Sequence, residues 1–78
     1  MNGWANYQTW NVTLYIANEE SLYFNAVEYV MNEGDNATYS GFIERMDLAD
    51  TVTPDGVGWL DPTIDYDEAD EFIKDLVS

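Results

Sequence analysis

The residues of this chain with the most chemical potential are the carboxylates that crowd its last quarter. Six acidic side chains lie between positions 65 and 75, and Asp61 precedes them. Carboxylates at this density could hold calcium, work as a general acid and base, or present a row of negative charge to a partner. These three kinds of chemistry make different demands on spacing and on neighbouring residues, so the sequence can separate them.

The acidic run does not fit a calcium-binding loop of the EF-hand type. A loop that starts at Asp65 would place Asp70 where the sharp turn needs glycine, and Leu76 where a bidentate acid is required. A loop that starts at Asp61 fails at the same two positions. We therefore expect no metal site and no cofactor in this chain.

Catalytic chemistry lacks its usual parts in this sequence. The chain has no histidine and no cysteine, and its only cationic side chains are Arg45 and Lys74. A nucleophile would have no base beside it, and an oxyanion or a phosphoryl group would have almost no cation to stabilise it. With sixteen acids, some pair will lie at a catalytic separation by chance, so such a pair carries little weight. We expect the protein not to be an enzyme.

The net charge of -14 limits the partners of the protein. Proteins that bind nucleic acid neutralise phosphates with lysine and arginine, so a chain with two cations is not expected to bind DNA, RNA or an anionic membrane directly. No apolar stretch approaches the ~20 residues of a membrane span, and the absence of cysteine favours a reducing cytosol. With 46% hydrophobic residues, the chain has enough core material to fold.

The run from Asp65 to Asp75 would be a poor stabiliser of a helix. Five like-charge pairs would lie three or four residues apart, whereas only Lys74 supplies the opposite charge, and each pair is worth about 0.2–0.5 kcal/mol. The run therefore either keeps the protein soluble or serves a partner. Its density is about one charge every 3 Å of helix, close to the ~3.4 Å per phosphate of one DNA strand. The candidate partner-binding residues are these acids and two nearby aromatics, for which core packing is the commoner role: Trp59, Asp61, Asp65, Tyr66, Asp67, Glu68, Asp70, Glu71 and Asp75.

At 78 residues the chain has room for one acidic domain, covering residues 1–78. We expect a mainly α fold of three or four short helices with one hairpin or turn element, and a loose start at residues 1–6. The segment Thr9–Asn18 is ambiguous, because its apolar residues fit both the alternation of a strand and one face of a helix. We favour a helix there; a strand would make the fold α+β.

Caps and spacing predict the other elements. Asn18 is expected to cap a helix that ends near Gly34. The next helix, with apolar residues from 39 to 49, is expected to begin at one of three caps: Asn36, Thr38 or Ser40. Gly41 should weaken the first turn of that helix by roughly 0.5–1 kcal/mol. Residues 51–59 predict a hairpin with Gly56 at a position of positive φ, and the last helix should begin at Asp65.

Residues 6–16 and 18–23 carry a distinctive pattern. They read NYQTWNVTLYI and NEESLY. They resemble the N-Y-x-T-W-N-V-x-L-W-I and N-D-E-x-L-Y of a family of short proteins without assigned function that tailed bacteriophages encode, marine cyanophages among them. Tyr15 stands where the family more often has Trp, and Glu19 replaces the Asp. A weaker likeness continues from Thr53 to Pro62, so most of the chain is covered.

The resemblance implies an origin and carries no catalytic or binding residues with it. It implies an accessory protein in the cytoplasm of the infected bacterial host. The small size and acidic composition, by analogy with other small acidic phage proteins, predict that it binds a host or defence protein there. The acidic run makes a nucleic-acid-handling host protein the expected partner, through mimicry of nucleic-acid charge. The alternative is a small structural module that self-associates through Tyr7–Tyr23 and whose acidic surface is only solubilising. The sequence leaves the oligomeric state open.

Overall fold

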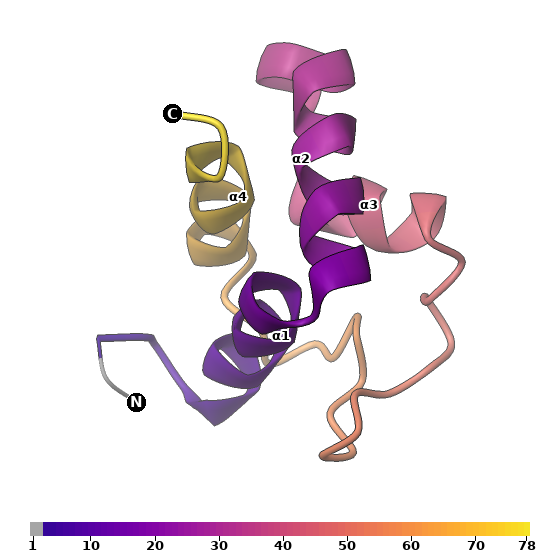
Figure 1. The fold of residues 1–78 in the computed structure, drawn as a ribbon. Coiled ribbons are helices and arrows are strands. Elements are labelled where there is room, and N and C mark those ends of the chain that lie inside the picture. Colours follow the sequence, from indigo (N-terminus) through magenta and orange to yellow (C-terminus); the bar gives the residue numbers. More distant parts are fainter. Residues whose placement is uncertain (1–2) are drawn as a thin grey trace.

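The computed structural model describes residues 3–78, which form four α-helices and one 3-10 turn (Figure 1). The elements are α1 (Tyr7–Asn18), α2 (Glu20–Glu33), the 3-10 turn η1 (Gly34–Asn36), α3 (Tyr39–Arg45) and α4 (Tyr66–Asp75). The prediction of a mainly α fold is confirmed. The α+β alternative is wrong, because Thr9–Asn18 is helical.

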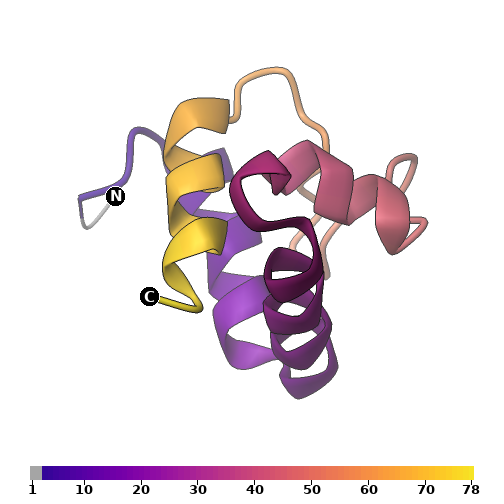
Figure 2. The ribbon, with the colours of Figure 1, turned by 90° about the horizontal axis from the view of Figure 1, so that it is seen from above.

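The helices enclose one core, and α4 lies against all three of the others. α1 packs on α2 and on α4, and α4 also contacts α2 and α3. The long connection between α3 and α4 runs around the outside of the molecule and returns to the start of α4 (Figures 1 and 2). Its hairpin is confirmed, because Val52 and Gly58 form an antiparallel bridge and Gly56 has a φ of 87°.

The junction between α1 and α2 differs by one residue from the prediction. Asn18 is the last residue of α1, and its side-chain nitrogen donates to the backbone carbonyl of Leu14 at 2.9 Å. Glu19 caps α2 instead, since its carboxylate accepts from the backbone nitrogens of Ser21 and Leu22 at 3.3 and 2.8 Å. A carboxylate is a favourable group at the positive end of a helix, so the junction needs only this one residue. The predicted end of α2 at Gly34 is confirmed.

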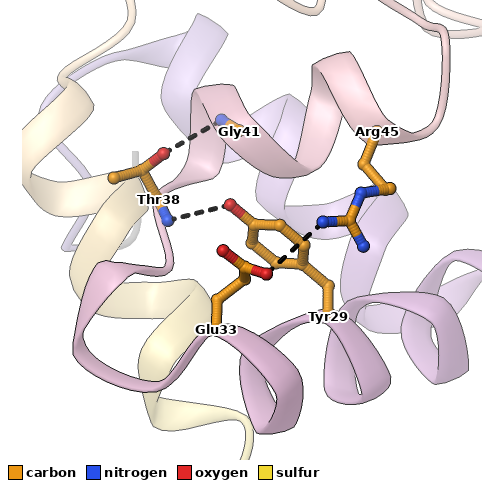
Figure 3. Close-up of polar contacts among 5 residues, drawn as sticks. All are labelled: Tyr29, Glu33, Thr38, Gly41 and Arg45. Atoms are coloured by element: carbon orange, nitrogen blue, oxygen red, sulfur yellow. Dashed lines mark hydrogen bonds and ion pairs between the residues drawn. The ribbon is translucent and has the colours of Figure 1, made fainter.

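Helix α3 begins at the predicted Thr38, whose hydroxyl oxygen accepts from the amide of Gly41 at 2.9 Å (Figure 3). Gly41 has a packing role that the sequence did not reveal. A Cβ at this position would collide with the hydroxyl of Tyr29, which itself accepts from the Thr38 amide at 3.3 Å. Glycine therefore lets α2 and α3 approach closely, at the cost of helix propensity.

Helix α3 ends at Arg45, earlier than the apolar stripe to Ala49 predicted. Asp47 adopts a left-handed conformation with a φ of 59°, and the amide of Leu48 donates to the carbonyl of Ile43 at 3.0 Å. Aspartate tolerates this conformation better than most residues, and it closes a helix as glycine does. Met46 and Leu48 still pack against the core from outside the helix.

Ala5 and Asn6 are tied down, although residues 1–6 were expected to be loose. Ala5 donates its amide to the carboxylate of Glu68 at 2.9 Å. Asn6 caps α1, and its amide nitrogen also donates to the carbonyl of Thr63 at 2.6 Å. Residues 1 and 2 lie outside the described part of the chain. These bonds hold the entry to α1 against the entry to α4.

Buried polar side chains join α1 to the long connection. The hydroxyl of Thr9 accepts from the backbone amide of Asp65 at 2.9 Å. The Oδ1 of Asn11 accepts from the hydroxyl of Thr53 at 2.7 Å, and its Nδ2 donates to a carboxylate oxygen of Asp55 at 2.8 Å. Thr9, Asn11 and Thr53 are all buried. A buried polar group without a partner is costly, so these bonds fix how the connection lies on α1.

Candidate interaction surface

Three of the acids at α4 have hydrogen-bonding roles inside the molecule. Asp65 caps α4 by accepting from the amide of Glu68 at 3.0 Å. The carboxylate of Glu68 holds the start of the chain through Ala5, as described above. Asp70 accepts from the backbone amide of Tyr39 at 2.7 Å and so caps the first turn of α3 from a different helix. The like-charge spacing made the run a poor stabiliser of a helix, and these three hydrogen bonds are stabilising contacts that the spacing did not reveal.

Asp61 is also engaged locally. Its carboxylate accepts from the hydroxyl of Thr63 at 2.6 Å and from the amide of the same residue at 2.8 Å. These bonds, the hydroxyl bond first, lower the pKa of the Asp61 carboxyl. The hydroxyl of Tyr66 donates to the Asp61 backbone carbonyl at 2.9 Å. Burial, followed by the nearby Asp61 charge, raises the pKa of Tyr66.

The aromatic candidates do not lie on an open acidic face. Trp59 is only 3% exposed, so its assignment as a partner-binding residue is wrong. Its carbonyl accepts from the buried hydroxyl of Tyr39 at 2.6 Å, and burial raises the pKa of that tyrosine. Tyr66 is half-buried, with its ring 6.1 Å from that of Tyr39. A small domain uses its large aromatics to fill the core, and both residues do so here.

Three acids remain without an internal role, and we call them the acidic edge: Asp67, Glu71 and Asp75. All three are exposed. They follow one another at intervals of four residues, which is about 6 Å of helix rise each. Within residues 3–78 their side chains accept no hydrogen bond and form no ion pair. The structure thus brings together three of the seven predicted acids as a line of charge available to a partner.

Beside the acidic edge lies a hollow of about 440 Å³, which we call the Trp4 groove. It is lined by Trp4, Glu68, Glu71, Phe72, Asp75 and Leu76. The rings of Trp4 and Phe72 meet edge to face, with centroids 5.8 Å apart. Two members of the acidic edge, Glu71 and Asp75, therefore stand at the rim of an aromatic floor.

The same two rings also line a smaller hollow of about 160 Å³ against α1. Its other apolar walls are Trp10, Leu14 and Ala17. Trp4 and Phe72 were not among the predicted site residues, because they lie far apart in the sequence and meet only in the fold. The sequence does place Phe72 between Glu68 and Asp75 on one face of the last helix. This spacing was the one sign in the sequence that an aromatic ring lies beside the acids.

The arginine of the protein, Arg45, contacts both an aromatic ring and a carboxylate (Figure 3). The guanidinium carbon of Arg45 lies 5.2 Å from the ring centroid of Tyr29. A terminal nitrogen of the same group pairs with the carboxylate of Glu33 at 3.4 Å. Arg45 thus combines a cation–π contact with an ion pair on the surface of α2 and α3.

The described residues contain no group of three or more acids, histidines or cysteines placed to hold a metal ion. Nor does any helix within residues 3–78 combine the length and the apolar character needed to cross a membrane. At α4 the surface offers a charged edge and an aromatic groove.

Comparison with known proteins gives a family. The whole chain, residues 1–78, matches a family model described as a family of unknown function (DUF7249), and the protein belongs to that family. No curated protein and no solved structure matches the chain.

Proposed function

We propose that the protein is a non-enzymatic phage accessory protein that binds a host protein in the cytoplasm of the infected bacterium. Its acidic edge would engage a cationic surface on a protein that handles nucleic acid, in the place that nucleic acid normally takes. Binding of this kind is steered by charge, so it forms fast and weakens with salt. The phage origin rests on the sequence pattern of residues 6–23, and the choice of partner rests on the charge.

The observation that carries the proposal is the unopposed charge of Asp67, Glu71 and Asp75. Like charges four residues apart destabilise a helix by about 0.2–0.5 kcal/mol per pair. The one cation of α4, Lys74, forms no ion pair among the described residues. The other acids of the region have hydrogen-bonding roles that explain them, whereas these three have none. Asp67 lies in the first turn, where the helix dipole favours its charge, but Glu71 and Asp75 lie beyond that turn. Their exposed charge costs folding energy and is accounted for by a partner of opposite charge.

The test compares two variants with the same change in net charge. In one variant the acidic edge is neutralised by D67N, E71Q and D75N. In the control, three exposed acids on α2, α3 and the connection are neutralised by E28Q, E44Q and D50N. Host proteins retained by the immobilised wild type at low salt are identified, and each is then assayed for displacement of labelled duplex DNA by the soluble variants.

The wild type is expected to displace DNA, with a potency that falls as salt rises. Neutralising the acidic edge should reduce the affinity about tenfold or more, equivalent to roughly 1.4 kcal/mol, and the control should change it much less. Equal losses in the two variants would show that only net charge matters. Binding without salt dependence, or no displacement of DNA, would contradict mimicry.

A second candidate function is self-association, and it rests on exposed apolar residues of α2. Phe24 and Met31 are 61% and 72% exposed and lie seven residues apart, so they share one helical face. Phe24 adjoins the Tyr7–Tyr23 segment for which self-association was the alternative prediction. Sedimentation equilibrium tests this candidate: a dimer that F24S with M31S dissociates supports it, and a monomer at all concentrations removes it.

A further inference from the structure

The Trp4 groove has the chemistry to receive a particular side chain. We infer that it binds an arginine of the partner protein, with the guanidinium against the aromatic floor and within reach of Glu71 and Asp75. This inference rests on the proposed function and makes it specific, because it names the group that the acidic surface would recognise. It places the point of recognition at one end of the acidic edge, where charge and aromatic surface coincide.

The lining of the groove matches arginine better than the alternatives. Tryptophan is the aromatic that attracts cations most strongly, and arginine is the cation that most often stacks on aromatic rings. The planar guanidinium can also donate to two carboxylates at once, whereas an ammonium is a compact point charge. A volume of about 440 Å³ lies within the range of about 300–1,000 Å³ typical of ligand sites, so a long side chain has room.

The protein itself contains the same combination. Arg45 lies over the ring of Tyr29 and pairs with Glu33, so one cation contacts an aromatic ring and a carboxylate together (Figure 3). The Trp4 groove offers an aromatic floor with carboxylates at its rim, and no cationic side chain lines it within the described chain. Its carboxylates make it complementary in charge to a cation that a partner would carry.

The smaller hollow beyond Trp4 suggests what adjoins the arginine. Its walls on α1 are mostly apolar, with Trp10, Leu14 and Ala17 around the shared rings. An apolar residue beside the arginine would bury surface there. The occupant is thus a segment of protein in which arginine and an apolar residue are neighbours, and not a nucleic acid, whose phosphates the acidic rim would repel.

The probe for this inference is a short peptide of alternating arginine and leucine, blocked at both ends. Binding is followed by NMR of the labelled protein, in which the indole signal of Trp4 and the amides of 71–76 report on the groove. A peptide with citrulline in place of arginine keeps the shape and removes the charge. A lysine peptide keeps the charge and removes the planar donor.

The arginine peptide is expected to shift the Trp4 indole signal in a saturable manner, and the citrulline peptide to leave it in place. The lysine peptide should bind more weakly than the arginine peptide. W4L should weaken binding by about twofold to thirtyfold, the range that cation–π contacts support, while V52A, a control at an exposed apolar residue of the connection, retains it. E71Q with D75N should also weaken it, and E28Q with E44Q should not.

The outcomes separate this inference from the proposed function. Signals of the groove that do not move with the arginine peptide overturn the inference, and this measurement on the wild type holds even if W4L fails to fold. Affinity that is lost on neutralising the acidic edge but kept in W4L also overturns it, and leaves the proposed function standing. A groove covered by a second copy, seen as a dimer that W4L dissociates, would overturn it as well.

Discussion

Removing the carboxylate of Asp70 should destabilise the protein far more than removing that of Asp67. Asp70 accepts from the buried Tyr39 amide at 2.7 Å, which leaves the first turn of α3 dependent on α4. A hydrogen bond to a charged group contributes about 1.5–3 kcal/mol, and an unpartnered buried amide carries a similar cost. Removing the charge of Asp70 also removes its repulsion from Asp67 and its attraction to Lys74. Each of these changes the free energy of unfolding by only about 0.2–0.5 kcal/mol, and the two act in opposite directions.

We therefore expect D70A to lower the free energy of unfolding by about 2 kcal/mol, or Tm by about 8–16 °C in a domain of this size. D67A should stay within about 0.5 kcal/mol of the wild type, because the exposed Asp67 side chain has no partner in the described chain. Both changes replace an acid by alanine inside α4, so the gain in helix propensity largely cancels in the comparison. D70N, which keeps an oxygen acceptor without its charge, should fall between the two.

The measurement is urea unfolding followed by tryptophan fluorescence and circular dichroism. The slope with urea should be unchanged, so that the shift in midpoint reports stability alone. If D70A and D67A differ by less than about 0.5 kcal/mol, the bond from Asp70 to α3 contributes little. The assignment of Asp70 to a structural role would then be wrong, and it would rejoin the acids available to a partner.

Three further perturbations test the packing by urea unfolding. G41A should lose about 1–3 kcal/mol despite the better helix propensity of alanine, because its Cβ meets the Tyr29 hydroxyl. In a Y29F background part of that loss should disappear and part should remain, because the Cβ also lies 2.9 Å from the Thr38 hydroxyl oxygen. Y39F should be about 1 kcal/mol less stable than the wild type at pH 8, since it leaves the carbonyl of Trp59 without a donor. Burial raises the pKa of the Tyr39 hydroxyl, so above about pH 10 the unfolded chain loses the hydroxyl proton while the folded protein keeps it. The difference in unfolding free energy between the wild type and Y39F should therefore shrink above pH 10, by up to about 1.4 kcal/mol per pH unit. T53V should cost about 1–3 kcal/mol, because it leaves a buried asparagine oxygen of α1 without its hydroxyl donor; an unchanged midpoint would contradict this.

Local chemistry made most of the helices predictable. Gly34 and Asp65 were recognised as end and start residues from their types, and the structure confirms both. Thr38 was one of three cap candidates for α3, and the structure selects it. Two helix boundaries differ from the prediction, and in both cases the cause is a local backbone or side-chain choice that residue types alone do not determine. At the α1–α2 junction two adjacent residues could both serve as caps, and the carboxylate of Glu19 took the position. At the end of α3, the left-handed Asp47 stops the helix although the apolar stripe continues.

The candidate site was predictable in its charge and unpredictable in its contacts. The density of acids at α4 is visible in the sequence, but their division into structural and exposed groups depends on what each helix packs against. Asp70 faces the start of α3, and Glu68 faces Ala5 from the opposite end of the chain. Both contacts join residues more than thirty positions apart, which no periodicity reports. The Trp4 groove was missed for the same reason, because Trp4 and Phe72 meet only in the fold.

The polar residues of the N-terminal segment restrict where a partner can bind. Asn6 caps α1, and its side-chain nitrogen also donates to the carbonyl of Thr63. The hydroxyl of Thr9 accepts from the amide of Asp65, and the side-chain oxygen of Asn11 accepts from the hydroxyl of Thr53 in the hairpin. A side chain whose donors and acceptors are used inside the molecule cannot offer them to a partner without giving up those bonds. The distinctive pattern of this segment therefore describes how α1 is fixed to the connection and to α4. Recognition must draw on other groups, and at α4 these are the exposed carboxylates of the acidic edge, two of which line the Trp4 groove.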